Sequence, residues 1–590
     1  MAANASHSEL TCRAVVAGLF VGCLIGASNV SVGLKIGLTF GATTTAAVLP
    51  FALFRTLRRF LSRPFGPREN MIATTAGSSA GSMATAAGVI SFIPALAMTG
   101  VHLSFFELIV WTLSTASLGV LFAVPLRRQM IIIEKLKYPS GTAAAETITA
   151  MYASGDTALS KAHVLLLAAL ASAALKLLLS LKPLGLGSLE LLSFDDVGLA
   201  TVGLAGVAFA TLRLGFSLSP MLLGAGVFIG KRTGWSLFVG SIFAWGIMAP
   251  LLTLAGVIAA GDAAQTYTNV LRWLVWPGAA MMVAAGLTSL VFQHGMVGRA
   301  ISSLRGSGPK SADDDSPAPM SARAWLLAIL AVTLVTLTLG WLLFGIQPWL
   351  GLVAILVSFV MAVIAVRATA ETDLNPVGPM AKVTQLVYGA LDPGNVTTNL
   401  LAAGITAAGA LQAGDLMHDL KAGYLLKVSA RRQVIAQLLG VGVGVFAVVG
   451  AYEVLSAAYP IPGDTFTGPA VQSWYAVAHV LTQGLAALPT GAPLAALVAA
   501  LIGVCLTCLS RIPRVAPYLP SPVALSIACL VPASYAWTLW AGSLIPGLLS
   551  RRRPELAERI AAPLASGLIA GEGLMMVIVA LLLLLGVPWV

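Results

Sequence analysis

The chain has 590 residues, of which 58% are hydrophobic and only 10% are charged. Soluble globular domains carry about 25% charged residues, so this composition excludes a soluble enzyme, a secreted disulfide scaffold, a disordered chain and a nucleic-acid-binding protein. The net charge of +11 comes from basic clusters between apolar runs, which is typical of the cytoplasmic loops of membrane proteins. The sequence therefore predicts an integral membrane protein surrounded by lipid.

The spanning segments are predicted to be α-helices rather than barrel strands. A helix crosses the hydrocarbon with about 20 apolar residues, and runs such as 249–260 and 575–590 are long and do not alternate in polarity. We expect about 14 to 16 spans, together with some half-helices. The candidate segments in chain order are 12–32, 35–57, 70–98, 103–126, 139–155, 161–182, 196–213, 215–231, 235–260, 270–298, 322–346, 349–367, 375–391, 395–413, 431–457, 466–483, 488–510, 518–549 and 563–590.

One long polar segment divides the chain near its midpoint. Residues 299–323 are rich in Gly, Ser, Pro and Asp, a composition typical of a flexible linker. We expect an N-terminal transmembrane half over residues 1–298, a cytoplasmic linker over 299–323 and a C-terminal transmembrane half over 324–590.

Weak internal similarity favours two duplicated halves. Asn70 and Asn395 each open a helix of small residues, and the segment that begins at Tyr138 resembles the one that begins at Phe466. Each pair is separated by about 325 residues. Internal duplication is typical of secondary transporters, whose sites form at the interface between repeats. A chance match between small-residue helices is the alternative.

The basic residues also predict the orientation. Residues 1–10 are polar, and the first apolar run continues almost directly into the second, so no cleavable signal is evident. We expect a cytoplasmic N-terminus and a retained first helix. The basic loops after the second and fourth predicted spans then face the cytoplasm.

Polar and ionisable side chains inside or beside apolar runs are the candidates for function, because a charge at the bilayer centre costs several kcal/mol. For each of them the alternative is a hydrogen bond at a helix end or between helices. The residues expected to bind substrate or protons are Asn29, Lys35, Glu146, Glu371, Asp373, Asn375, Gln412, Asp415, Gln472 and Glu572.

Two of the candidates lie in a segment that favours a broken helix. Asn29 and Lys35 belong to residues 29–42, where Gly33, Gly37 and Gly41 are four apart. A broken helix exposes backbone polar groups, which is tolerated only against protein or a water-filled cavity. The alternative is an outer loop in which Lys35 reaches the membrane surface.

Asp415 and Asp419 are four residues apart, so they share a helix face with His418 beside it. Such a set could bind a metal, but no second cluster supplies more ligands. We expect instead a helix cap at the cytoplasmic mouth, paired with Lys421 or Arg431. No metal site and no cofactor are expected. The sequence contains no nucleotide-binding motif and no hydrolase motif, so it argues against an ATP-driven pump and against an enzyme.

Several stretches of the chain resemble the oligopeptide transporter (OPT) family. They run in order from about residue 18 to 580, and the resemblance is strongest to prokaryotic members, which also resemble the yellow-stripe-like branch. The stretches are 29–42, 69–81 (Glu-Asn to Ser-Ser-Ala-Gly), 138–146 (Tyr-Pro-Ser-Gly-Thr-Ala-Ala-Ala-Glu), 392–404 (Asp-Pro-Gly-Asn-Val-Thr-Thr-Asn), 412–426 (Gln-Ala-Gly-Asp-Leu-Met-His-Asp) and 567–574 (Gly-Leu-Ile-Ala-Gly-Glu-Gly-Leu).

The resemblance implies an all-α polytopic membrane protein of about 16 transmembrane helices, in two duplicated halves with broken helices. It implies a multi-pass protein of the bacterial inner membrane that moves oligopeptides or peptide-like metal chelates by symport, with the proton gradient as energy source. The expected partners are this cargo and the lipid bilayer, with no nucleic acid; a homo-oligomer is left open.

We expect the binding cavity to form where the broken elements of the two halves meet near the midplane. Lys35 would attract a cargo carboxylate, and an acidic side chain would hold the cargo amine or the coupled proton. Two alternatives remain open at this point. One is a passive channel or pore for small polar solutes, and the other is a membrane-embedded enzyme acting on lipid-linked substrates.

Overall fold

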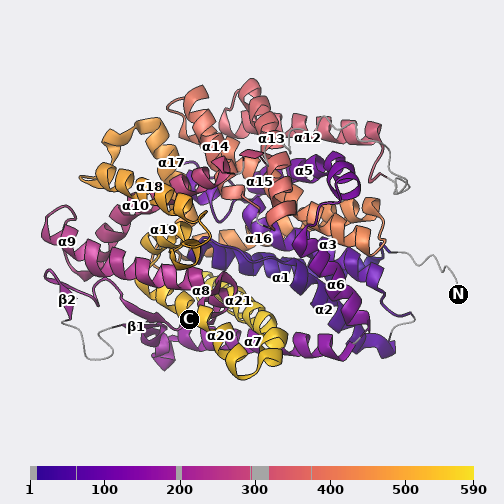
Figure 1. Cartoon of the computed structure of the whole chain (residues 1–590), viewed down its shortest axis with the longest axis horizontal. Coiled ribbons are helices and arrows are strands. Elements are labelled where there is room, and N and C mark those ends of the chain that lie inside the picture. Colours follow the sequence, from indigo (N-terminus) through magenta and orange to yellow (C-terminus); the bar gives the residue numbers. More distant parts are fainter. Residues whose placement is uncertain are drawn as a thin grey trace.

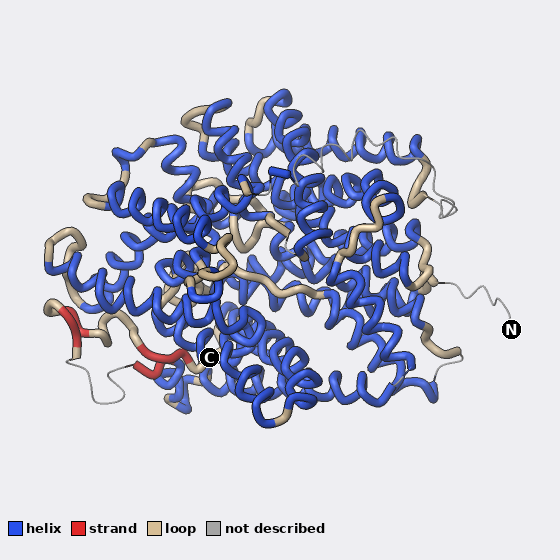
Figure 2. Tube along the Cα trace, in the orientation of Figure 1, coloured by secondary structure: helices blue, strands red, loops and turns tan. Residues whose placement is uncertain are grey.

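The computed structural model describes residues 9–60, 63–153, 155–193, 202–292, 294–295, 318–373 and 375–589. Helices dominate this part of the chain (Figure 1), and loops and short strands connect them (Figure 2). Eleven of the described helices are long and apolar enough to cross a membrane. The prediction of a polytopic helical membrane protein is therefore confirmed, whereas the number of about 16 spans stays a prediction.

The helices before the predicted linker pack into the lower and right-hand parts of Figure 1, with α9 and α10 at its left edge. Residues 296–317, which include most of the predicted linker, lie outside the described residues. The α-helices are α1 (Cys12–Ile36), α2 (Thr43–Thr56), α3 (Pro67–Ala86), α4 (Phe92–Ala97), α5 (Phe105–Arg127), α6 (Pro139–Ala153), α7 (Gly155–Ser180), α8 (Pro220–Ser241), α9 (Ala249–Leu254) and α10 (Ala263–Val291).

The helices after the predicted linker interleave with the first set. Segments of α5 and α8 continue as π-helices, at Arg128–Ile133 and Ile242–Met248. The later α-helices are α12 (Ala322–Phe344), α13 (Pro348–Thr372), α14 (Val377–Leu391), α15 (Val396–Leu425), α16 (Ala430–Ala458), α17 (Pro469–Gln483), α18 (Ala492–Leu509), α19 (Pro522–Leu530), α20 (Ala533–Arg552) and α21 (Pro554–Leu584).

The predicted span over 196–213 is wrong in its described part. Residues 202–213 form the hairpin of β2 (Gly203–Leu204) and β3 (Val207–Ala208), followed by turns. Glycine permits this turn: Gly206 has a φ of 81°, a left-handed conformation that glycine adopts without steric cost. A second antiparallel pair joins β1 (Leu191–Ser193) to β4 (Gly215–Ser217), so the all-α prediction omitted two small sheets.

Small residues allow α1 and α3 to pack backbone against backbone. A Cβ atom on Gly18 would lie 2.2 Å from the carbonyl oxygen of Ala73, and one on Gly22 would lie 2.5 Å from that of Gly77. Such contacts leave no room for a side chain. In lipid, where the hydrophobic effect does not drive helices together, this close approach supplies van der Waals packing.

Two half-length helices begin beside the ends of long helices from the other side of the linker. The backbone N–H of Tyr138, just before α6, donates to the carbonyl of Ala370 in α13 at 3.2 Å. The N–H of Gly468, just before α17, donates to the carbonyl of Leu34 in α1 at 2.8 Å. Both α6 and α17 have 15 residues. The end of α1 and the start of α17 are buried, whereas the meeting point of α13 and α6 is exposed at Ser140 and Thr372.

Candidate functional site

The last turn of α1 places Lys35 in an ion pair with Glu572 of α21. The Nζ atom of Lys35 lies 3.3 Å from Oε1 of Glu572, and the two side chains are only 2% and 1% exposed. The same Nζ lies 5.1 Å from the centroid of the Tyr535 ring. Glu572 also accepts hydrogen bonds from Oγ of Ser219 at 2.7 Å and from the N–H of Met221 at 2.8 Å. These donors stand at the start of α8, whose dipole favours a negative charge there.

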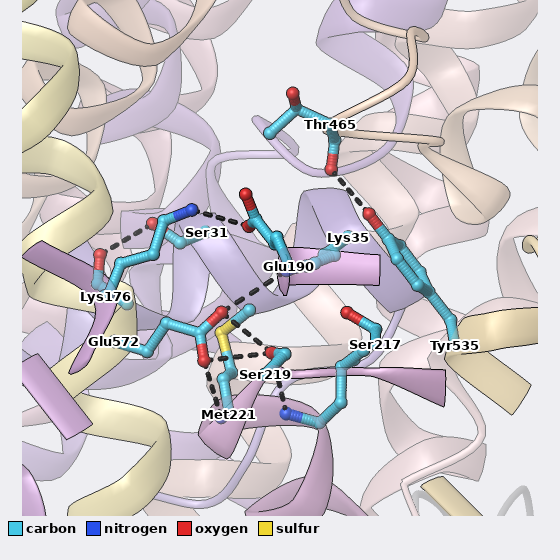
Figure 3. A network of polar contacts seen from close by, with 12 residues as sticks. Ser31, Lys35, Lys176, Glu190, Ser217, Ser219, Met221, Thr465, Tyr535 and Glu572 are labelled. Atoms are coloured by element: carbon cyan, nitrogen blue, oxygen red, sulfur yellow. Dashed lines mark hydrogen bonds and ion pairs between the residues drawn. The ribbon is translucent and has the colours of Figure 1, made fainter. Parts of the chain in front are cut away.

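A cavity of about 380 Å³ opens beside this ion pair. Figure 3 shows the polar network around it, with Lys176 reaching Glu190 and the hydroxyl of Tyr535 pointing to Thr465. The charged residues of its lining are Lys35, Lys176, Glu190, Arg213 and Asp464. The cavity therefore presents both cations and carboxylates to a ligand.

The charged residues of the lining form two more ion pairs. The Nζ of Lys176 lies 2.6 Å from Oε1 of Glu190, and an Nη of Arg213 lies 3.1 Å from Oδ2 of Asp464. Burial by itself raises the pKa of Glu190, but the charges of Lys176 and Lys35 and the hydrogen bond from Lys176 hold this pKa below its usual value. The side chains of Glu190 and Asp464 are 39% and 66% exposed, so a ligand can reach these pairs.

Elements far apart in the sequence build the cavity. Its wall combines the end of α1, the end of α7, the β1–β4 region, the loop 459–465, the start of α20 and the end of α21. Hydrogen bonds fasten α1 to α21: Oγ of Ser28 donates to the carbonyl of Ile569 at 3.1 Å, and Oγ of Ser31 donates to that of Gly573 at 2.9 Å. Figure 1 shows these first and last helices of the chain packed together.

A second group of predicted residues lies where α13 ends. Asp373 has a φ of 63°, and its carboxylate accepts hydrogen bonds from the N–H and Oγ of Ser140 at 2.8 and 2.7 Å. Nε2 of His418 lies 3.8 Å from the same carboxylate. Asn375 donates to the carbonyl of Ala410 in α15 at 3.1 Å. Asp373 thus caps the start of α6 from another helix and links it to α15.

A buried polar column connects α15 to α16 and α3. Gln412 accepts a hydrogen bond from Nε2 of Gln437 at 3.0 Å and donates to Sδ of Met83 at 3.3 Å. Asp415 lies one turn further on α15, half-buried. Asp419 is fully buried, and within the described part of the chain neither of its carboxylate oxygens has a hydrogen-bond partner.

The expected pairing of this acidic set with Lys421 or Arg431 is wrong for Asp419. Its backbone carbonyl accepts a hydrogen bond from Gln433 at 2.6 Å, whereas its carboxylate stays unpaired among the described residues. The reason is geometric, because α16 and α3 cover this face of α15 and Lys421 lies two positions away on the helix. The same described part contains no group of three His, Cys, Asp or Glu side chains placed to hold a metal ion.

The remaining predicted residues lie in separate places. Asn29 donates to the carbonyls of Phe40 and Gly81 at 3.1 and 3.0 Å, and so ties α1 to the following loop and to α3. Glu146 is on the exposed face of α6. Glu371 accepts a hydrogen bond from Arg367 at 2.8 Å.

Gln472 stands in the first turn of α17 and is buried. Its Nε2 donates to the carbonyl of Thr467, and Oγ1 of Thr467 donates to the carbonyl of Lys35 at 3.0 Å. The structure thus brings Lys35, Glu572 and Gln472 into one region and Asp373 and Asn375 into another. Their roles in binding stay predictions.

The sequence reasoning did not select four charged residues of the cavity, which are Lys176, Glu190, Arg213 and Asp464. The sequence could have pointed to Lys176, because this residue interrupts the apolar run of α7. The other three lie in loops or short elements, where a charge is ordinary and nothing in the sequence marks it.

Many apolar helices that enclose a cavity of mixed charge define the class of the protein, a polytopic membrane transporter. Comparison with known families identifies the particular one. The profile described as "OPT oligopeptide transporter protein" matches residues 9–583, so the chain belongs to this family and is a transporter rather than an enzyme.

The chain is similar over nearly its whole length to relatives from three kingdoms. A putative oligopeptide transporter of Saccharomyces cerevisiae is 26% identical, with 98% of this chain and 97% of the relative covered. A putative oligopeptide transporter of Haemophilus influenzae is 25% identical, with 93% and 92% covered. The metal-nicotianamine transporter YSL2 of Arabidopsis thaliana is 26% identical, with 96% and 92% covered.

Proposed function

We propose that the chain is a proton-coupled symporter that moves oligopeptides or peptide-like metal chelates across the bacterial inner membrane. The names of its relatives support both kinds of cargo, because the yeast relative is a putative oligopeptide transporter and the plant relative a metal-nicotianamine transporter.

The observation that carries the proposal is the mixed charge of the cavity beside Lys35. Peptides have an ammonium at one end and a carboxylate at the other, so a site for them needs groups of both signs. Arg213 and Lys176 can take a carboxylate, and Asp464 and Glu190 can take an ammonium. An Arg binds a carboxylate through two parallel hydrogen bonds.

The Lys35–Glu572 pair has a positioning role in this proposal. Both side chains are almost fully buried, so a ligand does not reach them without rearrangement. Because Glu572 also holds the start of α8, the pair fixes α1, α8 and α21 around the cavity. Lys35 then adds positive potential to the wall rather than a direct contact.

Protons are proposed to reach the transport cycle through the acidic residues of α15. Asp415 and Asp419 lie one turn apart inside the bundle, and the carboxylate of Asp419 has no hydrogen-bond partner among the described residues. An unpaired charge inside a membrane protein is costly, so intramembrane carboxylates mark proton pathways. The coupling of such a residue to cargo binding is the basis of symport.

The matching contacts of α6 and α17 support the duplication of two halves over 1–298 and 324–590. In each half a 15-residue helix starts at the end of a long helix of the other half. Broken elements that meet at a repeat interface are the usual place of substrate binding in secondary transporters.

Uptake by proteoliposomes under an imposed pH gradient tests the proposal. We expect accumulation of a labelled tripeptide or of a metal–nicotianamine complex above its external concentration, and collapse of this accumulation with a protonophore. Arg213→Gln should raise the KM for the cargo, whereas Lys231→Gln, an exposed lysine of α8, should not. Equilibration without accumulation would identify the rival passive channel.

A further inference from the structure

A buried lysine marks a second cavity, of about 270 Å³, on the other side of the α1 tip. Lys382 of α14 is only 6% exposed, and it lines this cavity together with Gly37, Ser91, Met282, Ser473 and Trp474. Lys382 is not part of the lining of the charged cavity beside Lys35.

The hydrogen bonds of Lys382 do not neutralise its charge. Its Nζ donates to Oε1 of Gln385 at 2.8 Å and to the carbonyl of Ser473 at 3.4 Å, and it lies 4.6 Å from the centroid of the Trp474 ring. All three partners are uncharged. Lys382 forms no ion pair with a carboxylate anywhere in the described part of the chain.

A second polar group in the same cavity lacks a hydrogen-bond partner among the described residues. Oγ of Ser473 is buried, and within the described residues it makes no hydrogen bond. Buried polar groups are almost always satisfied, so an unpaired hydroxyl next to a buried lysine without a counter-ion needs an explanation. A carboxylate bound in the cavity would satisfy both groups, because its two oxygens can accept hydrogen bonds from Lys382 and Ser473 and its charge would balance that of a protonated lysine.

The rest of the lining indicates what is attached to this carboxylate. Met282, Ile90, Val377 and Val523 supply apolar wall. A cavity of about 150 Å³ can hold a benzene molecule, so this one accommodates a single amino-acid side chain with its carboxylate but not a whole oligopeptide.

We infer that this cavity is a subsite for the C-terminal residue of the cargo, in which Lys382 and Ser473 bind the terminal carboxylate. The inference rests on the proposed function and names the part of the cargo that this site recognises. Trp474 and the apolar wall hold the side chain of that residue.

The test uses N-acetylvaline as the probe and N-acetylvalinamide as its neutral counterpart. Dissociation constants come from the dose-dependent thermal stabilisation of the purified full-length protein. We expect the acid to bind about 10- to 100-fold more tightly than the amide, the range of a charge-assisted hydrogen bond. In Lys382→Gln this ratio falls to about one, and in Ser473→Ala it falls several-fold.

A matched control and a stability measurement distinguish the loss of carboxylate binding from a general effect on folding. Lys231→Gln on the surface of α8 should leave the ratio unchanged. Lys382→Gln should not lower the melting temperature without probe, because it removes a buried charge that has no counter-ion. If that variant fails to fold, Ser473→Ala carries the test alone.

Two results would overturn the inference. One is a wild-type protein that binds acid and amide equally, and the other is a Lys382→Gln or Ser473→Ala variant that keeps the full preference. Peptide uptake is measured separately in proteoliposomes. Acid preference without any peptide uptake would refute the proposed cargo and leave the carboxylate site intact, whereas uptake without acid preference would refute the subsite alone.

Discussion

The surroundings of the Lys35–Glu572 pair predict that removing the charge of Glu572 lowers the free energy of unfolding more than removing the charge of Lys35. In Glu572→Gln the ammonium of Lys35 stays buried and loses the carboxylate charge 3.3 Å away, while the ring of Tyr535 at 5.1 Å and the more distant charge of Glu190 remain. Breaking a buried pair in this way costs about 3 to 5 kcal/mol. In Lys35→Met the carboxylate keeps its bonds to Ser219 and Met221, so we expect a loss of only about 1 to 3 kcal/mol.

Equilibrium unfolding in mixed detergent micelles, followed by circular dichroism, measures these free energies. The double variant Lys35→Met/Glu572→Gln removes both charges, so it should be more stable than the sum of the single losses predicts, by at least about 0.5 kcal/mol. Glu146→Gln makes the same chemical change on the exposed face of α6 and should stay within about 0.5 kcal/mol of wild type.

Two results would refute this reasoning. Equal losses from the two single variants would mean that the hydrogen bonds from the start of α8 do not support the carboxylate. Strict additivity in the double variant would mean that the two charges do not interact, despite the 3.3 Å between their atoms.

Three further predictions follow from the fold. Gly22→Leu should abolish the yield of monodisperse protein, because its Cβ would lie 2.5 Å from the carbonyl oxygen of Gly77. Gly442→Leu should be tolerated, because a Cβ there would meet no neighbouring atom of the described residues within 4 Å. The pKa of Glu190 is lowered in the folded protein, so the ionised Glu190 stabilises the fold fully above its unfolded pKa of about 4.3. This stabilisation is lost as the pH falls through the lower folded pKa. A series of melting temperatures at acidic pH should show the loss, and the Lys176→Met variant should no longer show it. Asp373→Ala should destabilise more than Asp373→Gly in thermal unfolding, by about 1 kcal/mol, since both lose the bonds to Ser140 but only alanine retains the strain of a φ of 63°.

The sequence predicted the class of the protein and its charged candidates because both depend on local composition. Lys35 and Glu572 stood out as charges at or inside apolar runs. Their pairing could not be predicted, since the two residues are 537 positions apart and nothing local in the sequence connects them. The prediction of a span over 196–213 failed because the apolar residues in its described part form a hairpin. Apolar character alone does not distinguish a membrane span from a hairpin.

Lysines were harder to interpret than acids. A lysine at the end of an apolar run commonly extends its charged group to the membrane surface, and the sequence of α7 or α14 does not say whether the surface is within reach. In the structure Lys176 turns toward Glu190 and Lys382 is enclosed by α17. Only the packing of neighbouring helices decides between these outcomes.

The two cavities meet at the tip of α1, and this arrangement gives the two proposals a common geometry. Lys35 lines the charged cavity, whereas Gly37, two residues later, lines the cavity of Lys382. The start of α17 holds this tip through Thr467 and Gly468, which donate to the carbonyls of Lys35 and Leu34 at 3.0 and 2.8 Å. A cargo whose carboxylate passes from one cavity to the other must therefore displace the α1 tip or the start of α17. The bond from Thr467 comes from its side-chain Oγ1 and that from Gly468 from its backbone N–H, so a side chain and the main chain together join the start of α17 to the end of α1.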